Sequence, residues 1–229
     1  MTTSRGLLMV WTNIPEHLEA DFNEWYNREH MPERILDLDG FVRGRRFVAY
    51  AGGPRYLALY DTLSIAAFHS EPYLALKRDY DPLSRRFVPK FQDTVKVVAQ
   101  VSAQAGAAEG SFLALLPIAR SADQHGPLRN WIASTLLAEL LALNGVVSAW
   151  YAERNDDAMV MAKQDHLRGT DRILDGMLVI EATSNEALDA AALVHTWDRI
   201  GAQGGGADVP AARLRNIYSL HSSSALQLS

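Results

Sequence analysis

The densest group of chemically capable side chains in the sequence lies between positions 21 and 34. Apolar residues recur just before and within this stretch at the spacing of one buried helix face, at Leu18, Phe22, Trp25 and Tyr26. The next residues at that pitch are polar, and one of them is His30. Because imidazole ordinarily titrates near neutrality, it can accept or donate a proton. The stretch therefore predicts a helix that ends in a ligand-facing site, with His30 as the candidate acid or base.

Met31 and Pro32 set the expected end of this helix. The residue before a proline is disfavoured in the α conformation, so the helix is expected to end or kink at Met31. His30 would then lie in the last turn, where the negative end of the helix dipole favours a cation. A lone histidine at a helix end is more often a cap or a surface residue. The crowding of Asn27, Glu29 and Arg34 around His30 favours a site.

Several neighbouring side chains could complete the site. Tyr26, one turn before His30, could donate a hydrogen bond to a developing oxyanion. Arg34, Arg43 or Arg45 could hold a carboxylate or a phenolate. Further substrate contacts and apolar walls are expected from Asn27, Trp25, Phe47 and Tyr60. Ordinary core packing is the stronger interpretation of Trp25.

Signals for other kinds of site are weak. His17, His30 and His69 lack the close spacing of a metal-binding pair, so no metal site is expected, and His69 is a reserve acid or base. The glycines at 204–206 follow a predicted helix and lack the pattern of a phosphate-binding loop. Haem is conceivable, but no motif singles out an axial ligand. The sequence therefore indicates no cofactor.

Composition excludes some classes of partner. The 229 residues are 48% hydrophobic and 21% charged, which is ordinary for a globular protein of one large or two small domains. A net charge of −5 gives no electrostatic case for nucleic-acid binding. The absence of cysteine excludes disulfides and thiolate metal sites. No run approaches the roughly 18 apolar residues of a membrane span, and no signal peptide is recognisable. A cytoplasmic protein with a small-molecule substrate is expected.

The predicted elements fall into two halves with the same order. The first half reads as strand, helix, strand, strand, helix, strand, at about 5–12, 16–30, 41–50, 55–61, 64–76 and 94–101. The second half repeats this order at about 112–118, 128–143, 146–152, 177–182, 185–200 and 214–220. The stretch Ala103–Gly110 is rich in small residues and reads as a linker. We therefore expect an internal duplication, with the halves packed sheet to sheet as an internal pseudo-dimer.

The halves differ in chemistry. The predicted helix of the second half carries apolar and small residues from Trp131 to Leu136, where the first carries the polar run. The domain boundaries are expected at 1–102 for the half with the site, 103–111 for the linker and 112–229 for a degenerate half. A long connection, Asn155–Gly176, could be a lid, but a solvated excursion is the favoured interpretation. A homodimer through helix or edge-strand surfaces is also expected.

Three stretches carry a resemblance to a known superfamily: Phe22–Pro32, Gly40–Phe47 and Arg55–Tyr60. Over residues 6–100 the chain resembles the dimeric α/β-barrel superfamily, and EthD-like proteins in particular. The second half matches only in element order. The resemblance implies an α+β fold of two ferredoxin-like βαββαβ repeats that form a barrel. It also places the superfamily's recurrent histidine at His30 and the aromatic residue before it at Tyr26.

Members of the superfamily that this chain resembles include isomerases, cyclases, decarboxylases, dehydratases and monooxygenases. The expected function follows from these classes together with the candidate site residues. We expect a cofactor-independent enzyme of the lyase, isomerase, cyclase or decarboxylase type. It would act by acid–base catalysis on a small aromatic or hydrophobic metabolite in a degradation or secondary-metabolism pathway. The metabolite could be an anion. The alternative is a non-catalytic binding or accessory protein. A haem-dependent or cofactor-free monooxygenase is the less favoured third reading.

Overall fold

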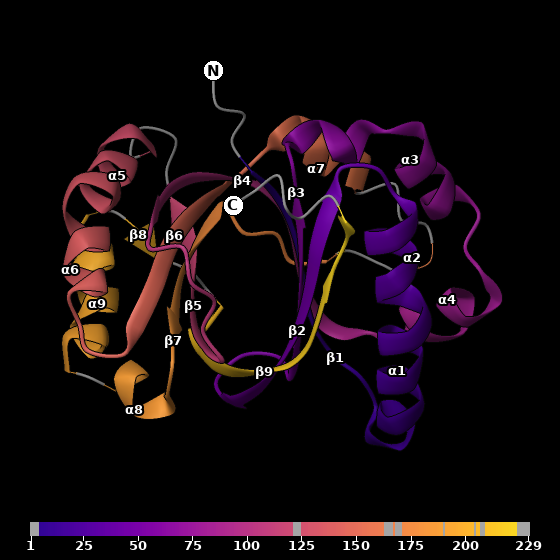
Figure 1. Ribbon diagram of the computed structural model, residues 1–229, viewed down its shortest axis with the longest axis horizontal. Coiled ribbons are helices and arrows are strands. Elements are labelled where there is room, and N and C mark those ends of the chain that lie inside the picture. The colour runs from indigo at the N-terminus through magenta and orange to yellow at the C-terminus, as the bar shows by residue number, and fades with distance from the viewer. Residues whose placement is uncertain are drawn as a thin grey trace.

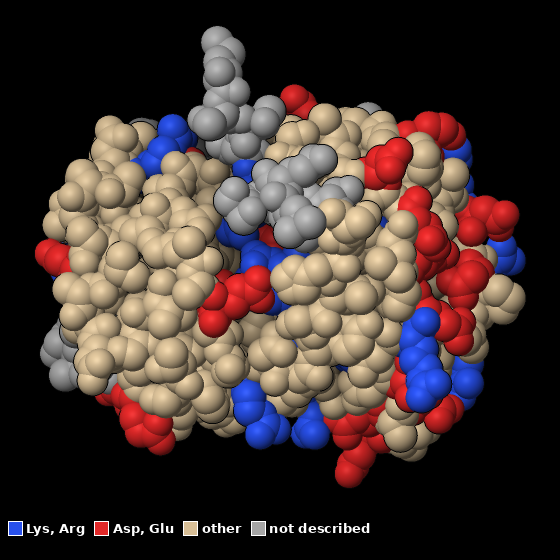
Figure 2. All heavy atoms as spheres, in the orientation of Figure 1, with Lys and Arg blue, Asp and Glu red and all other residues tan. Residues whose placement is uncertain are grey.

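The structure is a computed structural model. It describes residues 5–120, 125–162, 167, 171–189, 191–203, 205–206 and 209–223. Among the helices in these ranges, none is long and apolar enough to cross a membrane. On the face shown in Figure 2, acidic and basic side chains are interspersed over the half that carries helices α1 and α2, and the other half is mostly uncharged.

The first half of the chain follows the predicted order, with two additional short helical elements, α4 and η4, before its last strand. Its elements are β1 (Gly6–Asn13), η1 (Glu16–Leu18), α1 (Glu19–Trp25), η2 (Tyr26–His30), α2 (Met31–Asp37), β2 (Phe41–Ala51), β3 (Tyr56–Thr62), η3 (Ile65–His69), α3 (Glu71–Arg78), α4 (Pro82–Phe87), η4 (Val88–Lys90) and β4 (Gln92–Ala105). Asp81 caps α4 by accepting hydrogen bonds from the backbone N–H groups of Leu83 and Ser84. Strand β4 reaches Ala105 and so extends into the stretch that was expected to be a linker.

Pro32 predicts that the first helix ends or kinks at Met31, and the helix does not end there. Met31 keeps helical angles (φ −75°, ψ −48°), and the helix continues through α2 to Asp37. The preceding turn, η2, is π-helical, and the Met31 N–H donates to the carbonyl of Tyr26, five residues back. A wide turn accommodates a proline because the helix there already departs from the regular pattern that needs its N–H. Such turns occur frequently at functional sites.

The second half contains β5 (Phe112–Arg120), α5 (His125–Trp131), η6 (Ile132–Leu136), α6 (Leu137–Leu141), β6 (Val146–Arg154), α7 (Asp156–Ala162), β7 (Gly176–Ala182), α8 (Asn185–Leu188), α9 (Ala191–Ala202), β8 (Gly205–Gly206) and β9 (Ala212–His221). Helix α7 lies in the long connection that was expected to be a solvated excursion. That interpretation is wrong for α7, because its Ala158 and Met159 are buried in the core under the first-half helices. Residues 163–166 and 168–170 of this connection lie outside the described residues.

Eight strands form a closed antiparallel barrel, which confirms the α+β barrel expectation (Figure 1). The strand order is β7-β6-β4-β1-β3-β2-β9-β5, and β5 pairs with β7 to close the ring. Within the first half the order is β4-β1-β3-β2, and within the second it is β9-β5-β7-β6. Each barrel strand therefore has two hydrogen-bonded neighbours. The barrel strands therefore offer no free edge for a homodimer. A homodimer through helix surfaces stays a prediction.

Side chains fill the barrel and two outer layers. Alternate residues of each strand point inward, as in Leu7, Met9 and Trp11 of β1, and these meet Trp150 and Leu214 of the second half. Helices α1 to α4 cover the outside of the first-half strands, and α5, α6, α8 and α9 cover the second (Figure 1). Each layer buries many large apolar side chains, at roughly 1.5–3 kcal/mol for each fully buried one. The candidate site lies in the layer under α1 and α2.

Candidate functional site

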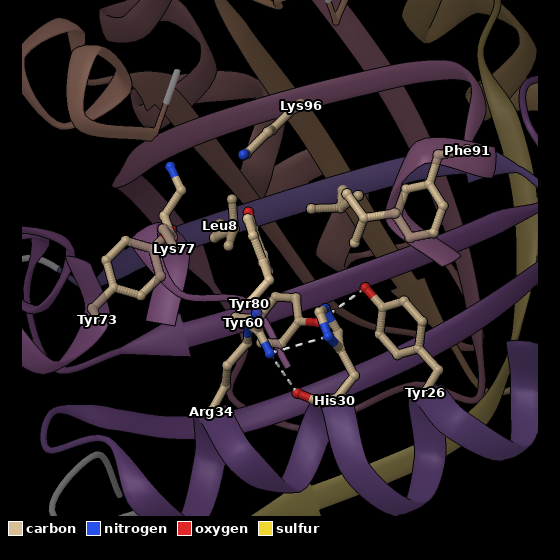
Figure 3. Close-up of a pocket in the computed structure, with 12 residues that line it drawn as sticks. Leu8, Tyr26, His30, Arg34, Tyr60, Tyr73, Lys77, Tyr80, Phe91 and Lys96 are labelled. Carbon is tan, nitrogen blue, oxygen red and sulfur yellow. Dashed lines mark hydrogen bonds between the residues drawn. The ribbon is translucent and has the colours of Figure 1, made fainter. Parts of the chain in front are cut away.

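A small cavity of about 40 Å³ lies between the first helix and the sheet. It is bounded by the helix segment η2–α2 on one side and by β1, β3 and β4 on the other, with α3 and the α3–α4 connection at its end (Figure 3). Its twelve lining residues are Leu8, Val10, Tyr26, His30, Arg34, Tyr60, Tyr73, Lys77, Tyr80, Val88, Phe91 and Lys96. Four tyrosines and four basic side chains, counting His30, share one buried space.

Tyr26, His30 and Arg34 reach the cavity from one face of the helix. They are spaced four residues apart and are all buried. The ring of His30 packs against Tyr26 and Trp25, with ring centroids 4.7 Å and 4.4 Å apart. Trp25 in turn stacks on Phe87 at 4.9 Å. The apolar residues of the helix therefore hold the imidazole in place.

Arg34 determines which nitrogen of His30 carries the proton. Its Nη1 lies 3.1 Å from Nδ1 of His30 and 2.9 Å from the His30 carbonyl oxygen. The same Nη1 also lies 2.9 Å from Oε2 of Glu33, so its two hydrogens are shared among three acceptors. A guanidinium has donors and no acceptor, so this contact requires Nδ1 to be the acceptor. The neutral imidazole then carries its hydrogen on Nε2. His30 is thereby arranged as a hydrogen-bond donor.

Charge on Arg34 is stabilised by its surroundings. Burial alone would lower the pKa of Arg34, but the interactions with Tyr60 and Glu33 outweigh it and raise the pKa above the ordinary value. Burial, assisted by Tyr26, raises the pKa of Tyr60 well above its ordinary value. Tyr60 therefore stays protonated and donates to the Tyr26 hydroxyl at 2.9 Å. The cavity combines a fixed cation with neutral hydroxyl groups.

Two buried lysines in the cavity were missed from the sequence. Lys77 comes from α3 and Lys96 from β4, and each is only 5% exposed. Figure 3 shows both entering from the side opposite Arg34 and His30. The sequence held a signal for Lys96, because this residue lies between Val95 and Val97 in an otherwise apolar run. Val95 and Val97 point into the barrel. A lysine on the other face of that strand must lie under the helices.

Arg43 and Arg45 do not reach the cavity. Alternation along β2 directs them, with Phe47, toward the barrel interior. Arg45 forms a bidentate pair with Glu181 at 2.8 and 3.0 Å. Arg43 donates from Nε to Asp61 at 2.7 Å. These two arginines and Phe47 were expected to contact substrate. The structure instead places them in a buried ionic cluster and the barrel core.

Asp61 lies at the centre of this cluster. It is fully buried, and Arg5 lies 3.1 Å from its Oδ1. Burial on its own would raise the pKa of Asp61, but Arg5, Arg43 and Arg45 lower it to about 2. Glu109 extends the cluster through a further ion pair with Arg43. The cluster is nearly balanced in charge, so it fits a structural role at this end of the barrel.

Arg46 points the other way and was overlooked. Its guanidinium lies over the ring of Tyr26, 4.3 Å from the centroid. It donates to Oδ1 of Asn27 at 2.6 Å and to Oδ1 of Asn23 at 2.8 Å. Asn27, expected to bind substrate, thus binds Arg46. Burial lowers the pKa of Arg46, with the surrounding tyrosines opposing that effect. Arg46 supports Tyr26 from behind.

Of the nine predicted site residues, the cavity brings together Tyr26, His30, Arg34 and Tyr60. Trp25 stands behind His30. The remaining four lie elsewhere: Asn27, Arg43, Arg45 and Phe47. The catalytic and binding roles of all nine stay predictions. The reserve candidate His69 is exposed on η3.

The residues present do not fit a haem group. The cavity at His30 is far smaller than a porphyrin, and Nδ1 of His30 is already bound to Arg34. A larger hollow of about 530 Å³ in the second half is lined by Ala51, Gly52, Ala114, Leu116, Leu188, Trp197, Ala211, Ala212 and Arg213. None of these described residues is a usual axial ligand. The described residues also contain no cluster of three or more metal-ligating side chains.

Comparison by sequence matches no family model and no curated protein. Comparison by structure matches an anthrone oxidase-like protein, with a TM-score of 0.66 and 10% identity over 97% of this chain and 95% of that one. A candidate monooxygenase from Fusobacterium nucleatum gives 0.60 and 8% identity over 96% of each chain. A haem-binding protein from Thermus thermophilus gives 0.54 and 12% identity over 98% of this chain and 94% of that one.

These likenesses establish the dimeric α/β-barrel, ferredoxin-like fold, but no specific EthD-like relationship. They also correct the functional expectation. The neighbours are described as oxidase-like, monooxygenase and haem-binding proteins, and none of these is described as a lyase or an isomerase. The lyase or isomerase prediction is therefore wrong on this comparison. It followed from an acid–base reading of His30, which does not distinguish proton transfer from oxidation.

Proposed function

We propose that this chain oxidises a small aromatic carbon acid with molecular oxygen in the cavity under α2. A carbon acid here is a compound whose C–H proton is acidified by an adjacent carbonyl group or ring system. The anion of such a compound can pass electrons to oxygen directly. The observation that carries the proposal is the lining of the cavity, where the buried Arg34–His30 pair lies beside the hydroxyl groups of Tyr26 and Tyr60. The descriptions of the structural neighbours support the same class of reaction.

The first step is ionisation of the substrate. Positive charge within about 4–6 Å favours the charged form of an acid, so the cavity lowers the pKa of a bound carbon acid. The low dielectric of a buried site strengthens this effect. The proton leaves to water, and the negative charge spreads over the aromatic system to its oxygen atoms. Arg34 stabilises that charge.

The second step is reaction of the anion with oxygen. A C–O bond forms between the carbanion and molecular oxygen, which gives a substrate peroxide. A proton from water neutralises its outer oxygen. The O–O bond then breaks as the second C–H proton leaves, giving a ketone and water. In sum, one methylene group and one molecule of oxygen give one ketone and one molecule of water, so the carbon loses four electrons and the oxygen molecule gains four.

His30 serves in this scheme as a hydrogen-bond donor. With Nδ1 bound to Arg34, its hydrogen is on Nε2, so the ring can stabilise an oxyanion. The sequence favoured an acid or base at this position. Substitution of His30 by leucine and by glutamine distinguishes that role from the role of a hydrogen-bond donor. Tyr26 and Tyr60, which are hydrogen-bonded to each other, are further hydroxyls that can orient substrate oxygen atoms.

Access to the cavity requires a side chain to move. The cavity of about 40 Å³ is smaller than an aromatic ring system. Tyr80 lines it and also lines an open surface hollow of about 580 Å³, together with Glu33, Asp79, Asp81, Pro82 and Arg85. In Figure 3 Tyr80 projects between the lysines and the His30–Arg34 pair. Rotation of Tyr80 would join the two spaces, and we propose this as the substrate entrance.

We also propose that the two halves descend from one ferredoxin-like unit and that the first kept the site. The strand orders β4-β1-β3-β2 and β9-β5-β7-β6 correspond element by element. A π-helical turn occurs in both first helices, at Tyr26–His30 and Ile132–Leu136. In the second half this helix is buried through Ile132, Leu136, Leu137 and Leu140. It has lost the polar side chains that the first half aims at its cavity.

The proposal is tested by oxygen uptake with anthrone as the substrate, since one structural neighbour is described as anthrone oxidase-like. The purified protein should consume one molecule of oxygen per ketone formed, and isotopically labelled oxygen gas should leave its label in the product. His30→Leu should lower kcat by about 10²–10³-fold, the usual cost of losing an oxyanion donor. His30→Gln keeps an N–H donor and should lose much less. His69→Leu, at an exposed histidine, is the matched control.

Two outcomes would contradict the proposal. One is the absence of oxygen uptake above the uncatalysed rate with anthrone and with a panel of related phenolic carbon acids. The other is full activity of His30→Leu. Equal losses in His30→Leu and His30→Gln would retain the reaction but restore the role of proton carrier for His30.

A further inference from the structure

We infer that Tyr26 carries the protons of the substrate peroxide and that Arg46 is the positioning residue that stabilises the Tyr26 anion. Tyr26 lines the cavity, and Arg46 is not among its described lining residues. The inference rests on the proposed function for the reaction. It deepens that reaction, because a side chain of the protein takes the place of the water that supplied the peroxide proton.

The first observation is the position of the Arg46 guanidinium. It lies 4.3 Å from the centroid of the Tyr26 ring, and only 1% of Arg46 is exposed. It donates to the side-chain oxygen of Asn27 at 2.6 Å and to that of Asn23 at 2.8 Å. Both asparagines are on the helix of Tyr26, so the helix that carries the ring also holds the cation against the face of that ring.

The second observation is that Arg46 has no carboxylate partner among the described residues. Its hydrogen bonds go to the two asparagine oxygens, and its other close contacts are with the rings of Phe22 and Tyr56, at 5.2 and 5.6 Å. Amide oxygens satisfy the N–H groups but bring no charge. Arg34, by contrast, is paired with Glu33. A buried positive charge without a counter-charge therefore lies beside Tyr26, and an anion there would compensate it.

The third observation is the direction of the hydrogen bond between the two buried tyrosines. Tyr60 donates to the hydroxyl oxygen of Tyr26 at 2.9 Å. Burial, assisted by Tyr26, raises the pKa of Tyr60 well above its ordinary value, so Tyr60 keeps its proton. Tyr26 is then the member of the pair that can lose its proton. A hydrogen bond to the charged form and an opposite charge within about 4–6 Å both favour that form, so Tyr60 and Arg46 act in the same direction.

The other titratable and charged side chains around Tyr26 include no carboxylate among the described residues. They are His30 and Arg34 from its own helix, Tyr56 and Tyr60 from β3, Arg46 from β2, and, across the cavity, Tyr73, Lys77, Tyr80 and Lys96. Negative charge on Tyr26 therefore meets no like charge from this set. Burial opposes the anion, because Tyr26 is only 2% exposed. We therefore assign the anion to a short-lived stage of the reaction.

That stage follows the addition of oxygen to the carbanion, when the outer oxygen of the substrate peroxide is an anion. The O–H bond of Tyr26 breaks, and its proton neutralises this oxygen. The resulting tyrosinate takes the second C–H proton while the O–O bond breaks, which gives the ketone and a hydroxide ion. The hydroxide takes up a proton from water, which balances the proton released when the substrate ionised. Tyr26 is thereby restored, and the products remain one ketone and one molecule of water.

The first experiment titrates single tyrosines in the protein without substrate. NMR of protein isotopically labelled at the phenolic carbon of tyrosine reports each hydroxyl, and Tyr26→Phe and Tyr60→Phe assign the two signals. Tyr26 should lose its proton at a lower pH than Tyr60. Arg46→Gln keeps hydrogen-bonding groups for the asparagines but removes the charge, so it should raise the titration midpoint of Tyr26 by about one to three pH units. Arg46→Lys keeps the charge and should shift the midpoint much less.

Arg55→Gln is the matched control. Arg55 also lies over a tyrosine ring, that of Tyr56 at 5.7 Å, but its side chain is 59% exposed. Its loss should leave the midpoint of Tyr26 unchanged. Thermal unfolding checks the fold of each variant. If Arg46→Gln does not fold, the order of the two wild-type titrations and the midpoint in Arg46→Lys decide the question.

Turnover with anthrone provides the second readout. Tyr26→Phe should release substrate peroxide into solution, where a peroxide assay measures it. Arg46→Gln should lower kcat by about tenfold or more and leave KM nearly unchanged, because Arg46 acts through Tyr26. Arg46→Lys should restore most of kcat. A purely structural role for Arg46 would lower the thermal stability without releasing peroxide.

Failure of this inference is distinguishable from failure of the proposed function. Loss of the Tyr60 proton before that of Tyr26 overturns the inference, and so does an unchanged Tyr26 midpoint in Arg46→Gln. Full activity of Tyr26→Phe without peroxide release also overturns it. Oxygen uptake with anthrone would stand in each case. Conversely, the expected shift in the midpoint of Tyr26 supports the role of Arg46 even if no oxidation is found.

Discussion

The guanidinium of Arg34 and the imidazole of His30 form one unit, in which Nη1 of Arg34 lies 3.1 Å from Nδ1 of His30. Both residues are on the same helix, four positions apart, and both line the cavity. The arginine also holds the carbonyl oxygen of His30 at 2.9 Å, so it binds the side chain and the backbone of the same residue. The tautomer of His30 is therefore a consequence of Arg34.

Replacing Arg34 should allow His30 to populate both of its neutral tautomers. In Arg34→Met the acceptor Nδ1 loses its donor, so the ring is expected to populate both neutral forms. The chemical shifts of the two ring nitrogens, measured by NMR on protein with isotopically labelled histidine, report the proton position directly. The wild-type protein should show protonated Nε2 and unprotonated Nδ1, and the variant a mixture.

Turnover provides the second readout for Arg34. Loss of the positioned donor should lower kcat for anthrone by about 10²-fold or more. Arg28→Met is the matched control, because Arg28 is exposed on the same helix and pairs only with the exposed Glu24 among its described ion pairs. A wild-type spectrum with the proton on Nδ1 would refute the assigned role of Arg34.

The sequence predicts the helix that carries the site better than the strands beneath it. Tyr26, His30 and Arg34 are on one helix, where spacing alone decides which side chains share a face. Strand β2 carries arginines on both of its faces, at Arg43 and Arg45 on one and Arg46 on the other. Alternation separates these two sets but does not say which one faces the helix. That depends on how the barrel closes, which involves the second half of the chain.

Lys77 and Lys96 show a different limit. They are nineteen positions apart and come together only because α3 and β4 both border the cavity. No local pattern relates them. The expectation that the helix ends or kinks at Met31 shows another limit. The helix does not end there, because the π-helical turn before Pro32 changes the hydrogen-bond pattern, and sequence rules for proline assume a regular helix.

The buried cluster around Asp61 predicts a specific sensitivity to acid. The pKa of Asp61 is about 2 in the folded chain. An unfolded aspartate titrates near about 3.9. A lowered folded pKa contributes stability that is fully present above the unfolded value and is lost as the pH falls toward the folded one. We expect about 2 kcal/mol of unfolding free energy to be lost between roughly pH 4 and pH 2 from this residue.

Urea unfolding at a series of pH values measures this contribution. Asp61→Asn removes the charge that faces Arg5 and Arg43, and should lower the unfolding free energy at pH 7 by about 3–5 kcal/mol, as for other broken buried ion pairs. Its stability should also change less with pH below about 4. Asp21→Asn, at an exposed aspartate, is the control. A variant with wild-type stability and wild-type acid dependence would show that Asp61 does not contribute.

Tyr80 provides the test of how substrate enters. It lines both the buried cavity and the surface hollow, and only 7% of it is exposed. If its ring must rotate before a ligand can pass, association in the wild-type protein includes a conformational step, and such steps lower association rate constants. Tyr80→Ala removes the ring and joins the two spaces. Stopped-flow measurement with anthrone under nitrogen should then show an association rate constant about tenfold or more above that of the wild type.

The dependence of the association rate on ligand size shows whether Tyr80 closes an entrance or only lines the cavity. Larger ring systems, such as anthrone, should gain more from Tyr80→Ala than phenol does, because a larger molecule needs a wider opening. Tyr50→Ala, at an exposed tyrosine on β2, should change neither rate. An unchanged association rate in Tyr80→Ala would place the entrance elsewhere. A faster dissociation without faster association would mean that Tyr80 contacts the bound ligand and does not control its entry.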